Sequence, residues 1–595
     1  MRILDRLARR GDELHHRDRP GRDISHLIGE RNPILQILSA VLLLSSFPLV
    51  LWDHGIIPHS SLGVANFPLV YLVGVSVASF SIALGVCGNS NTKYLVTSLL
   101  LLEAFIWLVP LRLMPLLPFP GSSHDFLFYS AWFSLLRSGH LSAGTYAYQS
   151  LPGFYLFASV TLEVTSIGGY LPVFEVTPFL MNLAATVFIY IFFKRAFGVG
   201  ETGIAFLATT LFVLLNFVGA TTEFAFFSFA FILLYFGLAV MAKLGVFDSS
   251  LPGPDGRGFL LLVILFAAMS ITHPEVTFAL LIVYLVVTTC KNLSKKRWSD
   301  VKFQISFASL LGFVLLTWTV FGASDFLIAY QGVIRSVFSL SPLSFISGGA
   351  VGAISAASTG HLMSNLVKTA VVASVCISAI PALLVLRRTP VARILFYALI
   401  AVAIEALLVG NLQGVGAVPR FMGYALPFIL ALDVLSLSMT KHSHLLVTLF
   451  LVASAPASIA TTYANVQFDL IPSSVVHATT YFNSALPNLS RDSQYSIYEF
   501  QVLGTFGPNV RTIVPYLNPV TPTGYQLVPT ATDFFSKGVL KGVNFVVTGA
   551  NTQQFVSFFG GDSNAVQNAT ATLGRNPIYR LVYSSLSINI FDVVL

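Results

Sequence analysis

The chain has 595 residues, of which 55% are hydrophobic and only 10% are charged. A soluble globular protein has roughly 25% charged residues, so a chain this poor in charge must place most of its exterior in lipid. The formal net charge of +7 does not indicate a nucleic acid partner, because Arg and Lys accumulate in the cytoplasmic loops of membrane proteins. The three cysteines all lie in apolar runs, which excludes a disulfide framework or a zinc motif in the polar C-terminal part.

A polar, Arg-rich tail, residues 1–32, opens the chain, and apolar runs long enough to cross a bilayer follow it. We place the crossings at 34–52, 66–87, 94–113, 172–193, 201–219, 223–242, 258–273, 275–290, 302–321, 366–387, 391–410, 421–440 and 443–461. These thirteen crossings are an odd number, so the two ends of the chain are expected on opposite sides of the membrane.

One of these apolar stretches, 258–290, is too long for a single span, because as one helix it would measure about 48 Å. His273 and Pro274 lie in its middle. Proline interrupts the helical hydrogen-bond ladder, so the sequence predicts a hairpin whose turn faces outward.

The basic residues of the loops set the orientation. Every second loop is rich in Lys and Arg, and the loops between them hold almost none. The basic loops carry Lys93, Lys194, Arg195, Lys243, Arg257, Lys291, Lys295, Lys296, Arg297, Lys302, Arg387, Arg388, Arg393 and Lys441. By the positive-inside rule these loops are cytoplasmic. The N-terminus is therefore expected in the cytoplasm and the C-terminal part outside the cell membrane.

Two long external segments and a polar C-terminal region complete the organisation. The first segment, 114–171, is predicted to contain interfacial helices at 126–138 and 151–167. The second segment, 322–365, is rich in Ser, Gly and Ala. Residues 462–595 contain short β-type runs between Gly, Pro and Asn and are predicted to form a small α/β domain. The fold class is thus mainly α, a polytopic helical bundle with an extracytoplasmic α/β domain. The predicted divisions are 1–32, 33–93, 94–461 and 462–595.

Ionisable residues near a bilayer are costly and are functional candidates by default. On the external side, carboxylates that could accept a proton occur together with Arg, Lys and His that could hold a phosphate. The candidate catalytic residues are Asp125 and Glu223. The candidate substrate-binding residues are His124, Arg137, His140, Glu163, His273, Glu275, Arg335, Lys368 and Arg420.

Short motifs at these positions resemble the GT-C glycosyltransferases, polytopic enzymes that take sugars from polyprenyl-phosphate carriers. The matching stretches are Asp125-Phe126, Trp132-Phe133, Gly139-His140, Tyr148–Phe154, His273-Pro274 and Pro419-Arg420-Phe421. In that family an acidic motif follows a transmembrane helix and precedes two interfacial helices, as Asp125 does here. The resemblance implies that Asp125 is the acidic motif, Glu223 is the second acid and Arg420 contacts the phosphate. The His273-Pro274 turn is similar to that of archaeal-type members.

The chain also departs from the family pattern. Asp125 follows the third crossing rather than the first, which makes 33–93 an added N-terminal hairpin. The motif is a single carboxylate, and the chain has no Trp-Trp-Asp signature. This argues against transfer of a whole oligosaccharide to asparagine. The sequence predicts no cofactor and no metal site; a divalent metal is compatible with the motifs but not supported by them.

Each candidate has a plainer explanation. Asp125 is also suited to cap the helix that follows it, and Arg420 is suited to anchor a helix at the interface. Glu223 is equally consistent with a solvated position at the membrane edge. His273 and Glu275 would be explained by a role in the Pro274 turn. Glu103 and Glu405 lie within crossings and are equally consistent with buried partners.

Three functions fit the sequence. The first is a transferase of the hexosyltransferase type that moves a sugar from a polyprenyl (dolichyl) phosphate carrier to a hydroxyl of a glycan, lipid or protein acceptor, with inversion and with Asp125 as the base. The second is a transporter or flippase for lipid-linked sugars, which would favour polar residues at mid-bilayer and an internal repeat. The third is a membrane scaffold whose C-terminal domain binds a partner.

Overall fold

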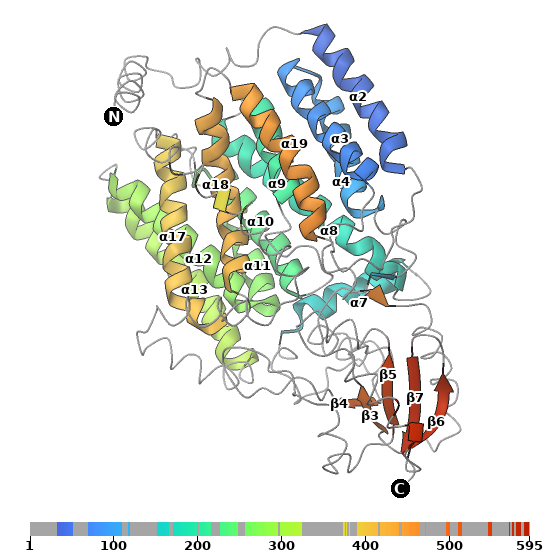
Figure 1. Cartoon of the computed structure of the whole chain (residues 1–595). Helices are drawn as coiled ribbons and strands as arrows, with labels where there is room; N and C mark the ends of the chain where they lie inside the picture. The colour runs from blue at the N-terminus through green and yellow to red at the C-terminus, as the bar shows by residue number, and fades with distance from the viewer. Residues whose placement is uncertain are drawn as a thin grey trace, which may run out of the picture.

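The structure is a computed structural model of the whole chain, shown in Figure 1. It describes residues 32–51, 69–109, 117–118, 151–165, 171–198, 202–215, 226–247, 256–294, 298–323, 390–413, 417–438, 443–462 and 470–471, five strands between 495 and 593, and scattered positions at 370–380 and 571–575.

Long apolar helices form the bundle, and twelve of the thirteen predicted crossings coincide with a helix. They are α2 (Pro33–Leu51), α3 (Leu69–Cys87), α4 (Thr92–Trp107), α8 (Leu171–Phe197), α9 (Thr202–Leu215), α10 (Phe226–Lys243), α11 (Gly256–Thr272), α12 (Pro274–Ser294), α13 (Trp298–Thr317), α17 (Pro390–Gln413), α18 (Ala417–Ser438) and α19 (Ser443–Thr462). The predicted crossing 366–387 is described at only a few positions. Within the part of the chain that the structure describes, six helices are long and apolar enough to cross a membrane. The chain is therefore a multi-pass helical membrane protein.

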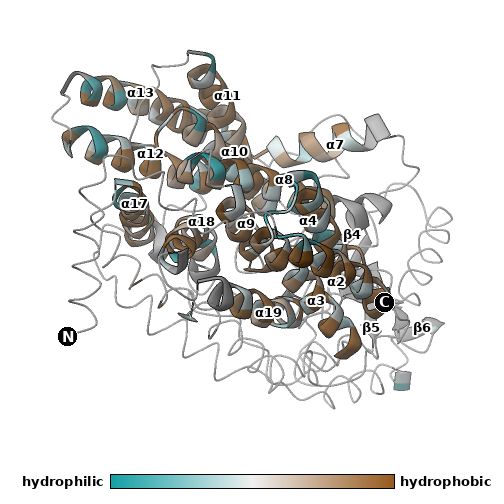
Figure 2. Ribbon diagram, turned by 90° about the horizontal axis from the view of Figure 1, so that it is seen from above, coloured by the Kyte–Doolittle hydropathy of each residue, from teal (hydrophilic) through white to brown (hydrophobic). Residues whose placement is uncertain are grey.

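The helices are hydrophobic along most of their length, as the hydropathy colouring of Figure 2 shows, and many apolar side chains are exposed on the outside of the bundle. On α2, Ile34 is 74% exposed, and on α13, Phe313 is 67% exposed. In water this arrangement would be unstable, whereas hydrocarbon around the bundle solvates such side chains. The lipid-facing surface is thus built into the outer helices.

The N-terminal hairpin is packed firmly onto the rest of the bundle. Ser39 of α2 donates to the Ser81 carbonyl oxygen of α3 at 2.7 Å, and Ser81 donates to the Ser39 carbonyl oxygen at 2.9 Å. Gly74 lies so close to Leu49 and Val50 that a Cβ there would collide with them. Small residues and short side-chain hydrogen bonds are the usual means by which helices associate in lipid. In turn, α3 packs against α4, α9 and α19.

The predicted break inside 258–290 is confirmed: α11 ends at Thr272, and α12 begins at Pro274. The two helices run in opposite directions. The starts of α11 and α13 lie side by side, as the 5.5 Å between the Phe259 and Phe303 ring centroids shows, and α13 begins at Trp298, just after α12 ends at Ser294. Tyr284, at the middle of α12, packs on Phe307 of α13 with 5.6 Å between ring centroids. The helices therefore form a hairpin with His273 at its turn.

The far end of this hairpin holds a buried cation. Lys291 of α12 is 4% exposed and donates to the Gly245 carbonyl oxygen at 2.5 Å and to that of Val246 at 3.4 Å. Both carbonyls lie just past the end of α10. The cation thus stabilises two carbonyls of the turn that follows α10, near the negative end of the helix dipole.

The turn end of the bundle also carries α7, β1 and β2. Helix α7 (Gly153–Thr165) corresponds to the predicted interfacial helix 151–167, whereas the predicted helix 126–138 and most of the segment 322–365 lie outside the described residues. Strand β1 (Leu117–Pro118) pairs antiparallel with β2 (Leu470–Ile471). The segment after α4 and the segment after α19 therefore meet at one side of the bundle.

The C-terminal part contains a mixed sheet of five strands, drawn in red in Figure 1. Its order is β4-β3-β5-β7-β6, with β3 parallel to β4 and β5 and with β7 antiparallel to β5 and β6. The strands are β3 (Tyr495–Glu499), β4 (Val510–Ile513), β5 (Phe545–Gly549), β6 (Tyr579–Ser584) and β7 (Ile588–Val593). The described strands fit the predicted α/β domain, whose boundary near 462 stays a prediction.

Candidate functional site

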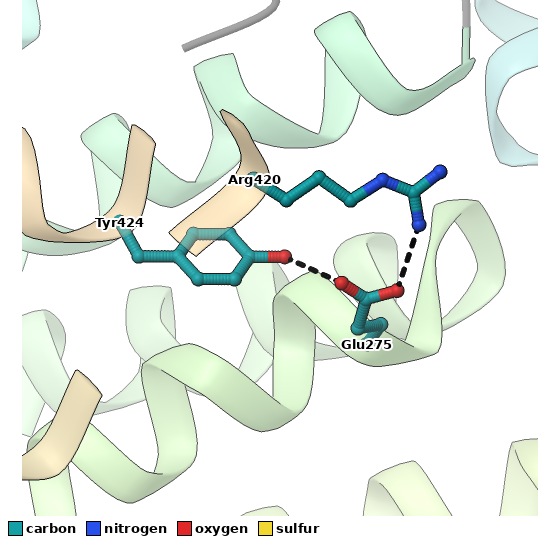
Figure 3. A network of polar contacts seen from close by, with 3 residues as sticks. All are labelled: Glu275, Arg420 and Tyr424. Carbon is teal, nitrogen blue, oxygen red and sulfur yellow. Dashed lines mark hydrogen bonds and ion pairs between the residues drawn. The ribbon is translucent and has the colours of Figure 1, made fainter. Parts of the chain in front are cut away.

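Three polar side chains from two helices meet at the turn end of the bundle (Figure 3). Arg420 of α18 lies with its Nη1 atom 3.3 Å from Oε2 of Glu275 on α12. The hydroxyl of Tyr424, also on α18, donates to Oε1 of Glu275 at 3.0 Å. Both oxygens of one carboxylate are thus engaged by α18.

The local sequence explains this placement. Pro274 occupies the first position of α12, where its missing N–H costs nothing, and Glu275 follows in the first turn. A carboxylate there is favoured by the helix dipole. Arg420 and Tyr424 are four residues apart and therefore share one face of α18. One face of α18 is in this way directed at the start of α12.

Aromatic rings form a wall around the ion pair. The guanidinium of Arg420 lies 4.6 Å from the centroid of the Phe227 ring, a cation–π contact. The edge of His273 meets the same Phe227 ring at 5.3 Å. Phe231, one turn further along α10, stacks on Tyr424 at 5.1 Å. These contacts fix the orientation of both Arg420 and Tyr424.

The side chains of the site differ in their exposure to solvent. The Arg420 side chain is 28% exposed and that of Glu275 is 12% exposed, while His273 and Tyr424 are buried. Burial lowers the pKa of His273, and the positive charge of Arg420 lowers it further. His273 is therefore neutral at neutral pH. The positive charge of this described site resides on Arg420.

A second carboxyl lies beneath the ion pair. Glu405 of α17 is fully buried, and neither of its oxygens has a hydrogen-bond partner among the residues that the structure describes. It is close enough to interact electrostatically with Glu275 and Tyr424. Helix α17 packs on both α12 and α18. A helix rises 1.5 Å per residue, so Glu405 lies about 12 Å from the C-terminal end of α17 and Tyr424 about 10 Å from the N-terminal end of α18. Both residues therefore lie at a similar depth below this end of the bundle.

Helix α7 adjoins the site. A Cβ on Gly153, the first residue of α7, would collide with Thr272 beside the turn. Phe157 of α7 stacks on Phe229 of α10 at 4.3 Å, two residues from Phe227. Part of the first long external segment is therefore anchored beside the ion pair.

The structure brings together three of the predicted site residues, His273, Glu275 and Arg420. Glu163 lies on α7, near the end away from Gly153, but its side chain is not among those described. The other predicted residues lie outside the described residues: His124, Asp125, Arg137, His140, Glu223, Arg335 and Lys368.

Sequence reasoning missed Tyr424 and Phe227. The signal for Tyr424 was present, since it lies four residues after Arg420 and so on the same helix face. Phe227 gave no signal, because it is one of 51 Phe residues in the chain. Its importance comes from its contact with Arg420, which is distant in sequence.

The chemistry of the described cluster suits an anion better than a cation. It offers one guanidinium on an aromatic ring and one carboxylate that a stronger anion could replace. Among the described residues no group of three or more His, Cys, Asp or Glu side chains could hold a metal ion. The described cluster is thus a candidate anion site at one end of a membrane-embedded bundle.

Fold and site together define a class: a multi-pass helical membrane protein with an Arg-centred polar site at one end of its bundle. No protein-family model matches the chain, and no curated protein matches it significantly.

Solved structures do match the chain. An Archaeoglobus fulgidus oligosaccharyltransferase, tethered with an acceptor peptide containing the NVT sequon, has a TM-score of 0.50 at 13% identity; the match covers 80% of this chain and 72% of that one. The structure of AglB of A. fulgidus in complex with an inhibitory peptide and a dolichol-phosphate has a TM-score of 0.48 at 13% identity. That match covers 80% of this chain and 72% of AglB. ArnT from Cupriavidus metallidurans has a TM-score of 0.46 at 10% identity, and the match covers 84% of this chain and 98% of ArnT. The first of these matches confirms the resemblance to GT-C glycosyltransferases, as a likeness of fold.

Proposed function

We propose that this chain is a membrane glycosyltransferase that uses a polyprenyl-phosphate-linked sugar as donor. The observation that carries the proposal is the Arg420–Glu275–Tyr424 cluster at the end of a GT-C-like bundle. A guanidinium held over an aromatic ring at the membrane edge suits the phosphate of a lipid carrier, whose chain would lie in the bilayer. The acceptor would be a hydroxyl of a glycan, a lipid or a protein.

The proposed mechanism is a single displacement at the anomeric carbon. Asp125 removes the proton from the acceptor hydroxyl, and the oxygen forms a bond to the anomeric carbon while the bond to the phosphate oxygen breaks. The configuration inverts, and the carrier leaves as a polyprenyl phosphate. Arg420, with Arg335 or Lys368, stabilises the charge on that phosphate. Glu223 is the second acid of the site, and no metal is required.

The remaining candidates have supporting roles in this proposal. His124, Arg137, His140 and Glu163 belong to the first long external segment, which would bind the sugar and the acceptor. His273 would shape the wall beside Arg420 and Glu275. The site would face outward, with the N-terminus in the cytoplasm and the C-terminal domain outside the cell membrane. The basic loops and the β1–β2 pairing, which brings the segments after α4 and α19 together, support this arrangement.

A flippase or transporter for lipid-linked sugars is the principal alternative. Buried Glu405 is the observation in its favour, because transporters keep ionisable groups inside the bundle. Glu405, however, adjoins the Arg420 cluster, so the transferase also accounts for it. A membrane scaffold would leave the cluster without a purpose.

The test is transfer of radiolabelled sugar by the purified protein, with a panel of polyprenyl-phosphate sugars and acceptor-rich membrane extract. Asp125→Asn should reduce transfer by at least about a hundredfold, because removal of a general base costs 10²–10⁴-fold. Donor binding should persist in that variant. The matched control is Asp300→Asn, at the opposite end of the bundle, which should retain activity. Release of no polyprenyl phosphate from any donor would favour the transporter or the scaffold.

A further inference from the structure

The first long external segment, 114–171, is held at two places that the structure describes. Near its beginning, β1 pairs with β2. Near its end, α7 packs on the last residue of α11, where Gly153 meets Thr272. Asp125 lies between these two anchors in the sequence. The placement of α7 is therefore one of the constraints on the segment that carries the proposed base.

The contact between α7 and α11 leaves no room for a side chain at Gly153. A Cβ there would collide with Oγ1 of Thr272 and would lie 3.1 Å from Cγ1 of Ile271. The Thr272 side chain is buried, and its hydroxyl donates to the Ala268 carbonyl oxygen at 2.7 Å, which fixes its orientation. Glycine allows the two backbones to approach this closely. Because interiors are close-packed, an added methyl group would push α7 away from α11.

The turn on which α7 rests also holds the ion pair. The backbone N–H of His273 donates to the Met269 carbonyl oxygen at 2.7 Å, and that of Thr277 donates to the His273 carbonyl oxygen at 3.3 Å. The turn is thus joined by hydrogen bonds to both α11 and α12. Glu275 of the ion pair follows Thr272 by three residues. Helix α7 and the phosphate site are therefore positioned by the same short turn.

A second contact connects α7 to the site through α10. Phe157 of α7 stacks on Phe229 with 4.3 Å between ring centroids. Phe227 and Phe231, two residues before and after Phe229, contact side chains of α18. Successive helical residues are about 100° apart, so residues two apart point to nearly opposite sides of the helix. Helix α10 therefore lies between α7 and the side chains of α18 that form the site.

We propose that Gly153 is a positioning residue: the close contact of α7 with α11 sets the position of the first long external segment relative to the phosphate site on Arg420. This inference rests on the proposed function, in which Asp125 of that segment removes the acceptor proton. A side chain at Gly153 would shift α7, and with it the segment that α7 belongs to. The Arg420–Glu275–Tyr424 cluster would stay complete, because its side chains come from α12 and α18. The donor would still bind, with the base misplaced.

The experiment measures sugar transfer and donor binding separately, on the full-length protein in nanodiscs. Transfer is the rate at saturating radiolabelled donor with acceptor-rich membrane extract. Binding uses a short-chain prenyl methyl phosphodiester, which keeps one negative charge across the neutral pH range, whereas a monoester titrates near pH 6. For Gly153→Ala we expect the rate to fall by about a hundredfold, as a misplacement of about 1 Å can cause. The affinity for the diester should remain that of the wild type.

A second substitution tests whether space is the cause. Thr272→Ala removes Oγ1, the atom with which a Cβ at Gly153 would collide. Gly153→Ala/Thr272→Ala should therefore recover much of the lost rate, and it is the variant to measure if Gly153→Ala alone does not fold. Thr272→Val loses the hydroxyl but keeps the branched shape, so Gly153→Ala/Thr272→Val should not recover.

A double-mutant cycle tests whether Gly153 acts through Asp125. A base that has been removed cannot be misplaced, so Gly153→Ala/Asp125→Asn should transfer within about twofold of Asp125→Asn alone. Two independent effects of about a hundredfold each would instead multiply to about ten-thousandfold. A loss of folded protein would lower the rate equally in both backgrounds.

Two other glycines provide matched controls. Gly256 is likewise the first residue of its helix, α11, but a Cβ there would have nothing within 4 Å, so Gly256→Ala should behave like the wild type. Gly74 of the N-terminal hairpin is crowded, because a Cβ there would lie 2.7 Å from Cγ2 of Val50. Gly74→Ala should lower the midpoint of thermal unfolding and leave the transfer rate of the folded fraction unchanged.

Three results would overturn this inference alone. One is full transfer by Gly153→Ala. Another is weaker diester binding in that variant, because α7 would then shape the phosphate site instead of positioning the base. The third is a loss that Thr272→Ala does not relieve or that multiplies with Asp125→Asn, which would give Gly153 a role in folding only. Absence of transfer by the wild type would overturn the inference together with the proposed function.

Discussion

Helices α10 and α12 are connected through a cation at each end, and the two connections differ. At one end Lys291 is buried and donates to two backbone carbonyls, those of Gly245 and Val246. At the other end Arg420 is 28% exposed and contacts the Glu275 carboxylate and the Phe227 ring. The ends of α10 are about 27 Å apart, so the two cations act independently.

The difference teaches how a structural cation can be distinguished from a functional one. Backbone carbonyls are neutral and cannot move away without unfolding the turn, so Lys291 is fixed. A carboxylate on a side chain can rotate away, and another anion can replace it at the guanidinium. A half-buried Arg with an exchangeable partner is thus suited to binding, and a buried Lys on carbonyls is suited to stability.

Among variants at these two ends, the largest effect is expected from Arg420→Gln. Loss of the charged hydrogen bonds to a phosphate should cost about 2–3 kcal/mol, or up to about a hundredfold in donor affinity. Thermal stability should change little, by about 1 kcal/mol or less, because partly exposed ion pairs contribute little. Titration of the purified variant with a prenyl phosphodiester, beside a thermal unfolding scan, measures both.

Two further variants serve as controls. Arg420→Lys keeps the charge but not the planar fork and should have intermediate affinity. The double variant Arg420→Gln/Glu275→Gln should bind as weakly as Arg420→Gln. Donor affinity unchanged in Arg420→Gln would contradict the assignment of the phosphate site.

The reverse pattern is expected for Lys291→Met. Two carbonyls at the end of α10 would lose a charged donor, at a cost of about 2 kcal/mol in the free energy of unfolding. The apolar part of the side chain would still fill the space. The midpoint of thermal unfolding should fall clearly, and donor affinity of the folded fraction should stay the same. A variant that unfolds like the wild type but fails to bind donor would erase the distinction between the two ends.

The smallest effect is expected from Tyr424→Phe. This change removes one hydrogen bond to the Glu275 carboxylate and keeps the stacking on Phe231. Because Glu275 would be held less firmly, donor affinity should rise by about fivefold, equivalent to about 1 kcal/mol. The sign is opposite to that of Arg420→Gln, and lower affinity in Tyr424→Phe would show that the hydroxyl contacts the ligand instead.

The sequence predicted the bundle well because lipid imposes a strong pattern. Each crossing needs about 20 apolar residues, and the break at His273-Pro274 was visible as a proline in an overlong run. Helix ends were less accurate. Helix α4 ends at Trp107 rather than at 113, consistent with Pro110 interrupting the helical ladder. The predicted start of the next crossing, Glu223, lies outside the described residues, and α10 is described from Phe226.

The candidate site was predicted only in part. Arg420 and Glu275 were both singled out because ionisable residues are costly near lipid. Their pairing was not foreseen, because 145 residues separate them and they meet only because α12 and α18 both pack on α17. The same holds for Glu405, whose place beside Glu275 depends on the packing of α17. Composition and motif give the members of such a cluster, and tertiary contacts decide which of them meet.

The short pairing of β1 with β2 sets an order of events during synthesis. Leu117 and Ile471 are partners in this ladder, yet about 350 residues of chain, including most of the bundle, are made between them. At a rate of 5–20 residues per second, Leu117 waits roughly 20–70 seconds for its partner. Closure of this ladder therefore follows insertion of α19. A truncated or misinserted chain would leave the segment around Leu117 unpaired, where a quality-control protease could recognise it.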